Sequence, residues 1–262
     1  MKKTLSLILL FSVSHVFALK GGVYFKAEEF PAVVAVYQTS RKSCTATKIA
    51  PKMYLTAAHC IALLNLSDFM RGNLYIKQSL NSFSGNISEI YLHPSVELND
   101  FTGSDSPRLR VSSIFSHIFS RNIIDVGIIK LKEEIPEIAS MGFYEGRIQR
   151  KMPVTLTAYG DTGSGYPLFP RTAPQEIKKV GGLFIQVKPS RKYPAEVMPG
   201  DSGSALLINE NGENKIAGVA AWKKPGIFGS TGYFVHPQHF QDWAFDVLDG
   251  LVGPNYTLPD FD

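Results

Sequence analysis

Short apolar stretches alternate with turn residues along most of the chain. Each stretch is rich in β-branched and aromatic side chains, and Gly, Pro, Asn or Ser stands at its ends. Runs of this length and composition predict the β-strands of a sandwich or a barrel. The clearest cover residues 32–37, 73–77, 154–159, 182–187, 204–208 and 216–222. The chain is therefore expected to be all-β, and we find no internal repeat or low-complexity tract in it.

A late segment, residues 237–248, is the one good helix candidate. Pro237 stands at its start and Gly250 follows its end, which are favoured places for these residues at helix boundaries. The apolar residues between them recur at helical spacing and are Phe240, Trp243, Ala244, Val247 and Leu248. The sequence thus predicts a C-terminal α-helix after the β-rich part of the chain.

Length and charge narrow the class of protein. The 262 residues, 44% of them hydrophobic, suffice for one large domain or two small ones with real cores. The formal net charge is +4, and two of the positive residues, Lys2 and Lys3, belong to a segment that we expect to be removed. Since no basic run is interleaved with aromatic residues, nucleic acid is not expected as a partner.

The first 18 residues have the features of a secretory signal peptide. Lys2 and Lys3 form a positive end, residues 5–11 are a largely apolar run, and Val16 and Ala18 place small side chains at the positions that a signal peptidase reads. The alternative is a membrane anchor, but the apolar run is too short to span a bilayer comfortably. We expect a secreted or periplasmic protein that has no membrane span once residues 1–18 are removed.

Cys44 and Cys60 are the two cysteines of the chain. In an exported protein, such a pair favours a disulfide over two free thiols. Closing a loop of this length stabilises the fold by about 3 kcal/mol in the chain-entropy model. A metal site is not expected, because two cysteines supply too few ligands and the other histidines do not cluster around them.

Three extended motifs carry candidate chemistry. They are LTAAHC at residues 55–60, DVGIIKL at residues 125–131 and PGDSGS at residues 199–204, and they supply His59, Asp125 and Ser202 in that order. A serine hydroxyl becomes a useful nucleophile when an imidazole takes its proton and a buried carboxylate orients that imidazole. Each residue alone would more often be structural, but the three motifs together favour catalysis.

On these motifs the chain resembles the trypsin/chymotrypsin-like serine endopeptidases, from about Leu19 to Leu248. The resemblance implies two antiparallel six-stranded β-barrels with the active site in the cleft between them. Within a peptidase domain at residues 19–262, the first barrel is expected at about 19–136, the second at about 150–236, and the helix at about 237–248. It also implies that a Cys44–Cys60 disulfide brackets the histidine loop.

The same resemblance assigns roles to the site residues. His59 would be the general base and then the general acid, Asp125 would accept a hydrogen bond from its other ring nitrogen, and Ser202 would attack the peptide carbonyl. The N–H groups of Gly200 and Ser202 would form the oxyanion hole. The enzyme would need no cofactor or metal, and would act on protein or peptide substrates as a monomer, with protein inhibitors as possible partners.

Asp201 would have a separate role in activation. In the family this aspartate pairs with a newly created N-terminal ammonium group, which orders the oxyanion hole. Leu19 directly follows the expected signal cleavage site, and Gly21 and Gly22 match the glycines of the usual new terminus. We therefore expect signal peptidase itself to create the activating N-terminus at Leu19, although Lys20 departs from the usual valine.

The primary specificity pocket would have Glu196 at its base, with Ala221, Trp222, Lys223 and Gly232 in its walls. A carboxylate there favours Arg or Lys before the scissile bond. The usual residue at the base is Asp, and Met198 stands where the family has a cysteine. Lys223 could obstruct the cleft, pair with Glu196 or attract acidic substrates.

Residues 95–124 form a longer loop than the family usually has. They could narrow specificity near the cleft, or they could be a tolerated surface loop with no role. Two other functions compete with a peptidase, namely a non-catalytic binding protein and an esterase. The intact set of His59, Asp125, Ser202 and Gly200 argues against the first, and the resemblance in fold argues against the second.

Overall fold

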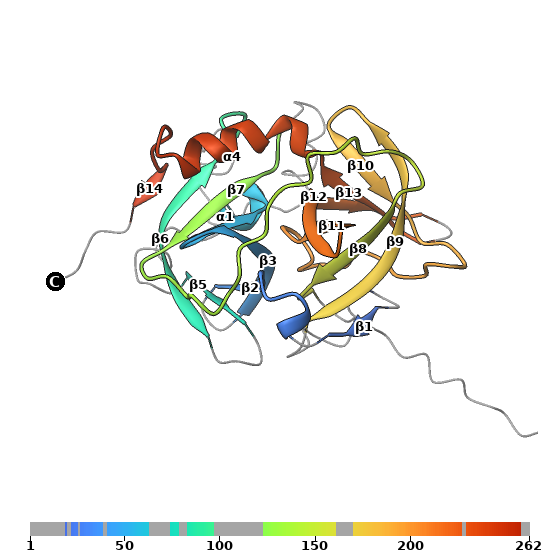
Figure 1. The fold of residues 1–262 in the computed structure, drawn as a ribbon, viewed down its shortest axis with the longest axis horizontal. Helices are drawn as coiled ribbons and strands as arrows, with labels where there is room; N and C mark the ends of the chain where they lie inside the picture. The colour runs from blue at the N-terminus through green and yellow to red at the C-terminus, as the bar shows by residue number, and fades with distance from the viewer. Residues whose placement is uncertain are drawn as a thin grey trace, which may run out of the picture.

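The computed structural model describes residue 19 and residues 22–25, 27–38, 41–62, 74–78, 83–96, 123–160, 170–226 and 229–257. The expected signal peptide, residues 1–18, and most of the loop at 95–124 lie outside these residues. The strands form two antiparallel sheets that lie side by side, with a helix across one end (Figure 1). None of the helices among the described residues has the length and apolar character needed to cross a membrane.

The first sheet closes on itself as a barrel. Its strand order is β6-β5-β2-β3-β4-β7, and β6 also pairs with β7, which completes the ring. A short seventh strand, β14 (Tyr256–Thr257), is added outside β6. The six barrel strands are β2 (Val33–Gln38), β3 (Arg41–Ala50), β4 (Met53–Thr56), β5 (Leu74–Lys77), β6 (Ser84–Leu92) and β7 (Gly127–Leu131).

The second sheet closes in the same way. Its order is β9-β10-β13-β12-β11-β8, and β8 also pairs with β9. The N-terminal strand β1 (Val23–Tyr24) pairs with β9, so it lies on the second barrel although it precedes the first in sequence. The six barrel strands are β8 (Pro153–Ala158), β9 (Arg171–Gly181), β10 (Phe184–Val187), β11 (Ala205–Glu210), β12 (Glu213–Lys224) and β13 (Thr231–Val235).

The predicted pair of six-stranded barrels is confirmed. Closure leaves neither barrel with an open edge, apart from the short outer strands β1 and β14. The six clearest apolar stretches correspond to β2, β5, β8, β10, β11 and β12. The other six barrel strands are not among these stretches. In β9 the inward positions include the buried polar residues Arg171 and Gln175, and the strand also contains Pro174.

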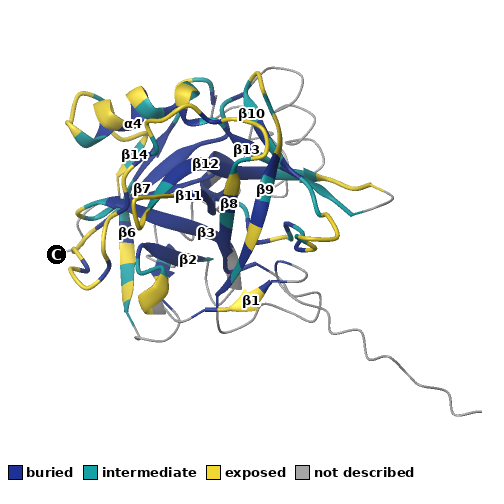
Figure 2. Ribbon diagram, turned by 45° about the vertical axis from the view of Figure 1, so that its right-hand side comes forward, coloured by how far each residue is buried: buried dark blue, intermediate teal, exposed yellow. Residues whose placement is uncertain are grey.

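The predicted C-terminal helix is also confirmed, with a different first turn. A 3₁₀ turn, η3 (Pro237–His239), precedes α4 (Gln241–Leu248), and the His236 ring accepts a hydrogen bond from the N–H of Gln238. Gly250 has a φ of +74°, the left-handed conformation that commonly ends a helix. The inner face of α4 is buried and its outer face is exposed (Figure 2).

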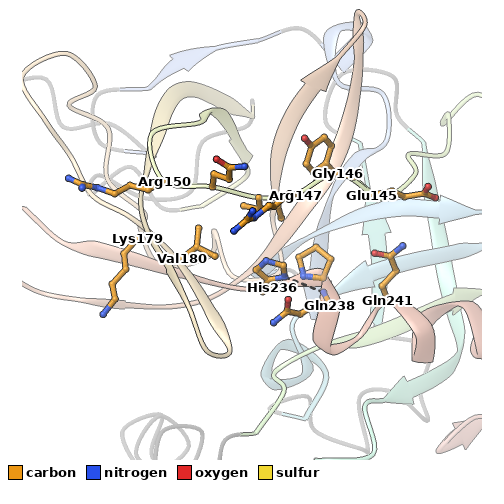
Figure 3. Close-up of a pocket in the computed structure, with 13 residues that line it drawn as sticks. Glu145, Gly146, Arg147, Arg150, Lys179, Val180, His236, Gln238 and Gln241 are labelled. Atoms are coloured by element: carbon orange, nitrogen blue, oxygen red, sulfur yellow. Dashed lines mark hydrogen bonds between the residues drawn. The ribbon is translucent and has the colours of Figure 1, made fainter.

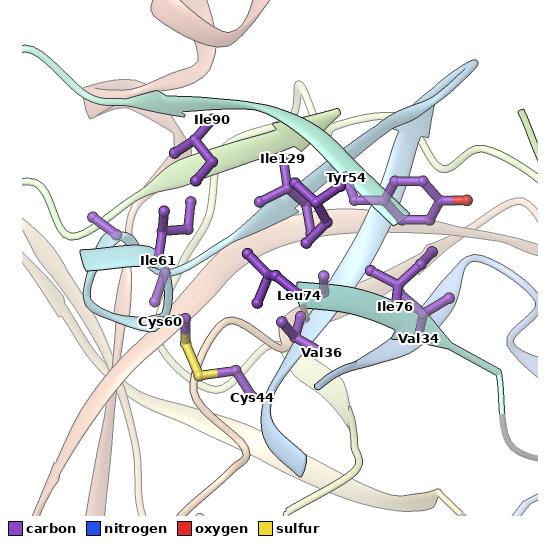
Figure 4. Close-up of a cluster of buried hydrophobic side chains, with 14 of the residues drawn as sticks. Val34, Val36, Cys44, Tyr54, Cys60, Ile61, Leu74, Ile76, Ile90 and Ile129 are labelled. Carbon is purple, nitrogen blue, oxygen red and sulfur yellow. A yellow bond between two sulfur atoms is a disulfide. The ribbon is translucent and has the colours of Figure 1, made fainter. Parts of the chain in front are cut away.

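Each barrel has its own core, and a third cluster joins them. In the first barrel, the cluster runs from Tyr54 at one side to the disulfide at the other, with Leu74 and Ile129 between them (Figure 4). The second barrel encloses a separate cluster that includes Leu19. The third contains residues of both barrels and of α4, such as Val126, Leu207 and Trp243. Burying an aliphatic or aromatic side chain contributes about 1.5–3 kcal/mol, so this cluster stabilises the relative position of the barrels.

Candidate active site

His59 lies in α1 (Ala58–Ala62), one turn of helix that follows β4 directly. Its Nδ1 is 2.7 Å from Oδ2 of Asp125, and its backbone N–H donates to Oδ1 of the same carboxylate at 2.9 Å. Both side chains are buried, with 4% and 1% of His59 and Asp125 exposed. Because an ionised carboxylate only accepts hydrogen bonds, Nδ1 carries the proton and Nε2 is left as the basic nitrogen.

Asp125 reaches His59 because β7 and α1 approach each other closely. The chain enters β7 at Gly127, where an added Cβ would lie 2.6 Å from Cδ1 of Ile61 and 3.0 Å from the carbonyl oxygen of Tyr91. A side chain at this position would press on the main chain of β6 and require Ile61 to shift, and it would touch Cα of Ala58 at 3.5 Å. The glycine two residues after the aspartate therefore allows β6, β7 and the turn that carries His59 to pack closely.

The disulfide between Cys44 and Cys60 is present, as predicted, and joins β3 to α1. Sγ of Cys60 is 3.8 Å from Nε2 of His59. The ligand atoms of Cys44, His59 and Cys60 lie within 4.8 Å of one another. Both sulfurs are used in the disulfide, so they are not thiolates that could bind a metal ion. The bond instead ties the histidine turn to the neighbouring strand.

The loop that carries Ser202 packs against the segment before His59. Gly200 and Gly203 have φ values of +87° and +79°, in the left-handed region that favours glycine. A Cβ on Gly203 would lie 2.1 Å from Oγ1 of Thr56 and 2.9 Å from the backbone nitrogen of Ala57. The glycine next to the serine thus allows the main chains of the two barrels to meet there.

Thr45, which the sequence did not single out, holds these segments together. Its N–H donates to the carbonyl of Ser202 at 2.9 Å, and its hydroxyl donates to the carbonyl of Gly200 at 3.1 Å. The same hydroxyl accepts from the N–H of Tyr159 at 3.0 Å, and the Thr45 carbonyl accepts from the Thr56 hydroxyl at 2.8 Å. Its position after Cys44 was the only signal in the sequence.

The predicted nucleophile and oxyanion donors lie in this loop. Among the described residues, no hydrogen bond joins the Ser202 hydroxyl to His59, and the N–H groups of Gly200 and Ser202 have no acceptor. Catalytic hydrogen bonds are often long before substrate binds and shorten in the complex.

Asp201 directly precedes Ser202 in the same loop, and its side chain is buried against Gly160, which follows β8. Oδ1 accepts from the N–H of Gly160 at 3.0 Å, and Oδ2 accepts from the N–H of Met198 at 2.7 Å. A Cβ on Gly160 would lie 2.0 Å from Oδ1, so this glycine is required for the carboxylate to fit. Leu19 is 1% exposed and belongs to the second-barrel core, but its nitrogen here is a peptide nitrogen, so the predicted ion pair with Asp201 stays a prediction.

The structure brings the predicted pocket residues to one end of β12 and β13. Lys223 pairs with Gly232 across these strands, and a Cβ on Gly232 would lie 2.7 Å from Cγ2 of Val197. Ala221 is buried at the strand bulge, and Trp222 stacks on Tyr233 with ring centroids 3.9 Å apart.

Two half-buried polar side chains face this pocket region. Oε2 of Glu196 accepts from the N–H of Ser230 at 3.0 Å, and Nζ of Lys223 lies 3.5 Å from Sδ of Met198. Among the described residues, Glu196 and Lys223 do not form an ion pair with each other. Lys223 was expected to obstruct the cleft, to pair with Glu196 or to attract acidic substrates, and the structure does not show the pairing with Glu196.

Comparisons with known proteins agree with this architecture. The family model described as Trypsin matches residues 19–244, whereas no curated protein matches the chain. Among solved structures, human heparin binding protein gives a TM-score of 0.67 at 15% sequence identity, over 90% of this chain and 99% of that chain. The atomic resolution structure of HBP gives 0.63 at 15% identity, with the same coverage. The likeness to these structures shows the fold, and the family model covers most of the sequence, so the chain belongs to the trypsin family.

Proposed function

We propose that the protein is an exported serine endopeptidase that cleaves peptide bonds through an acyl-enzyme intermediate. The observation that carries this proposal is the double hydrogen bond from His59 to the buried carboxylate of Asp125, beside a loop that presents Ser202. A binding protein would need neither an oriented imidazole nor a nucleophile next to it. Membership of the trypsin family supports the same conclusion.

In the first half of the reaction, Nε2 of His59 takes the hydroxyl proton of Ser202 while Oγ bonds to the substrate carbonyl carbon. Asp125 stabilises the imidazolium that forms, because its carboxylate already accepts the Nδ1–H. His59 then gives its proton to the leaving amine, and the carbon–nitrogen bond breaks. A water molecule attacks the acyl-enzyme in the second half, with His59 again as base and then as acid.

The negative oxygen of each tetrahedral intermediate would accept hydrogen bonds from the N–H groups of Gly200 and Ser202. The loop conformation supports this role. Its two left-handed glycines, Gly200 and Gly203, flank the nucleophile, and the hydroxyl and N–H of Thr45 fix two of its carbonyl groups. Donors that are already oriented need no reorganisation during the reaction, which is the main source of their effect.

The test is hydrolysis of a panel of peptide amides and matched esters by the mature protein and by Ser202→Ala. We expect amide hydrolysis by the wild type and a loss of about 10⁴-fold or more in the variant. Ser204→Ala is the control, because this neighbouring hydroxyl forms no hydrogen bond with the described residues. Turnover of esters without amides would indicate an esterase, and no turnover of either would favour a binding protein.

We further propose that removal of residues 1–18 activates the enzyme. The new ammonium group at Leu19 would then pair with the buried carboxylate of Asp201 and order the oxyanion hole. Two observations support this. The Leu19 side chain is already buried in the second-barrel core, and its φ of +36° is strained for a non-glycine residue. Cleavage after Ala18 removes the carbonyl carbon that defines this angle, and so releases the strain.

Activation can be tested by the N-terminal mass of the exported protein and its activity at high pH. Pairing with Asp201 would raise the pKa of the Leu19 amine above its usual value. The ion pair is then fully present below that usual value and is lost as pH rises through the raised pKa, so activity should fall in alkaline solution. A fully active protein that begins elsewhere, or activity that persists well above about pH 10, would contradict the proposal.

We also propose that Glu196 favours Arg or Lys before the scissile bond. Its carboxylate is half-buried, and one oxygen accepts from the Ser230 N–H. A charged substrate side chain would still find the second oxygen, which lies near Gly229. Lys223, on the opposite wall, approaches Met198 and would narrow the entrance to this pocket.

A further inference from the structure

A cavity lies among three segments at one end of the second barrel. The segments are the connection between the barrels at residues 144–150, the end of β9, and the turn from β13 into α4. Its volume is about 850 Å³, within the range of small-molecule binding sites. None of its lining residues belongs to the candidate active site described above.

The cavity has a strong excess of positive charge. Arg147, Arg150 and Lys179 line it, and Glu145 is the single carboxylate in its lining. Figure 3 shows Arg150 and Lys179 at one side, Arg147 beside His236 in the middle, and Glu145 at the other side. The positive end of the cavity is therefore separated from its one negative group.

These three cations are not neutralised by the rest of the described chain. Among the described residues, Arg147, Arg150 and Lys179 form no ion pair and no side-chain hydrogen bond. Like charges gathered around a concave surface create a positive potential that attracts anions. Guanidinium groups in particular bind phosphate and sulfate oxygens through pairs of parallel hydrogen bonds.

The remaining lining fits a ligand with many oxygen atoms. Side-chain amides of Gln149, Gln238 and Gln241 line the cavity and can both donate and accept hydrogen bonds. A volume of about 850 Å³ is far larger than a single inorganic ion needs. The charge and the amides together match a compact scaffold that carries hydroxyl groups and several anionic esters.

We propose that this cavity binds a small sugar-like polyanion bearing phosphate or sulfate esters, at a site separate from the active site. Its ester oxygens pair with Arg147, Arg150 and Lys179, and its hydroxyl groups bond to the glutamine amides. Such a ligand neutralises the three cations and leaves the cleft between the barrels free for substrate.

His236 gives this binding a pH dependence. Its Nδ1 accepts from the Gln238 N–H, and burial together with the nearby His239 lowers its pKa in the free protein. A bound anion raises that pKa, so binding takes up a proton and becomes tighter as pH falls. The charged and titratable groups around this ring, from its own turn, the connection and β9, are Glu145, Arg147, Arg150, Lys179 and His239.

Calorimetric titration of the mature protein with myo-inositol hexakisphosphate and with sucrose octasulfate tests the proposal. We expect one saturable site that weakens as salt is added, because the attraction is electrostatic. Arg147→Gln and Lys179→Gln should each weaken binding about tenfold or more. Lys178→Gln is the matched control, since it removes the same charge from the neighbouring residue of β9, which does not line the cavity.

Each side chain changed is exposed, so the variants should keep the melting temperature of the wild type. If only one probe binds, the result identifies whether the cavity prefers phosphate or sulfate esters. If both bind, the cavity accepts either ester. The absence of saturable binding, or equal weakening by Lys178→Gln, would overturn the proposal. Ser202→Ala should bind the probes like the wild type, so this result does not depend on whether the protein is a peptidase.

Discussion

The region around His59 and the region around Glu196 are built in different ways. His59, Asp125, Thr45 and Asp201 are buried, and each makes hydrogen bonds that leave its side chain a single orientation. Glu196 and Lys223 are only half-buried, and each has one polar side-chain contact with the part of the chain that the structure describes.

This difference in burial separates the residues proposed for bond cleavage from those proposed for substrate selectivity. Buried hydrogen bonds resist change, because removing one partner leaves the other unsatisfied in a medium of low polarity. Side chains with a single contact can be replaced without that cost. The residues proposed for bond cleavage are therefore part of the framework between the barrels, whereas the two charged residues proposed for substrate choice, Glu196 and Lys223, are only partly buried.

The largest expected effect comes from Asp125→Asn. The amide would keep the shape of the side chain but could present an N–H to Nδ1 of His59 and stabilise the wrong tautomer. We expect kcat on a peptide amide to fall by about 10³–10⁴-fold with little change in KM. Asp242→Asn, an exposed acidic residue of α4, is the control. If Asp125→Asn keeps more than about a tenth of the activity, the proposed role of this carboxylate is wrong.

Thr45→Val tests whether the framework holds the nucleophile loop. The change removes the hydroxyl bonded to Gly200 and Tyr159, so we expect about 1–3 kcal/mol of lost stability. Misplacement of the loop should also lower kcat by about tenfold to a hundredfold. Denaturant unfolding and kinetics with a peptide amide measure both effects.

Two further variants make the Thr45 result specific. Thr45→Ser keeps the hydroxyl and should restore most of the activity. Thr47→Val changes the same residue type on the same strand, where the buried hydroxyl has no partner among the described groups, and should leave kcat unchanged. Equal effects of the valine variants at 45 and 47 would mean that strand packing, not the hydrogen bonds, supports the loop.

Glu196→Gln should change selectivity far more than the reaction. We expect the ratio of kcat/KM for an Arg substrate over a neutral one to fall about tenfold to a hundredfold, because the charge pair is lost. Hydrolysis of the neutral substrate should stay near the wild-type rate. Glu210→Gln, an exposed residue of β11, controls for net charge. An unchanged ratio would show that Glu196 does not contact the substrate side chain.

The smallest expected effect concerns stability in acid. Burial lowers the pKa of His93 to about 4, and the ring accepts a hydrogen bond from the Ser95 N–H. Folding favours the neutral ring of His93. Its contribution to the free energy of unfolding is therefore fully present above the ordinary pKa of histidine and is lost as pH falls toward about 4.

For a half-exposed ring we expect a loss of about 1 kcal/mol after solvent screening, measured by urea unfolding between pH 7 and 4. His93→Asn retains an acceptor for the Ser95 N–H but does not titrate, so its stability should depend less on pH over this interval. An identical pH dependence in the two proteins would exclude His93 as the cause.

Apolar periodicity predicted the strands and the C-terminal helix, and the two cysteines predicted the disulfide. The pairing of the strands into two barrels followed from the family resemblance that the motifs at 55–60, 125–131 and 199–204 carry. The sequence could not predict β9, whose inward-facing Arg171 and Gln175 hide the alternation of the strand. Nor could it predict Thr45, since the bonds of Thr45 to Gly200 and Tyr159 connect residues more than a hundred positions apart. Contacts of that kind depend on the closed fold rather than on any local pattern.

The most direct test of the central claim is the intact mass of the folded, exported protein before and after reaction with a fluorophosphonate. Our account predicts one adduct, located at Ser202, and none on Ser202→Ala. The unmodified mass should correspond to a chain that begins at Leu19. A folded protein that begins at Leu19 and forms no adduct would contradict the claim that His59 and Asp125 activate this serine.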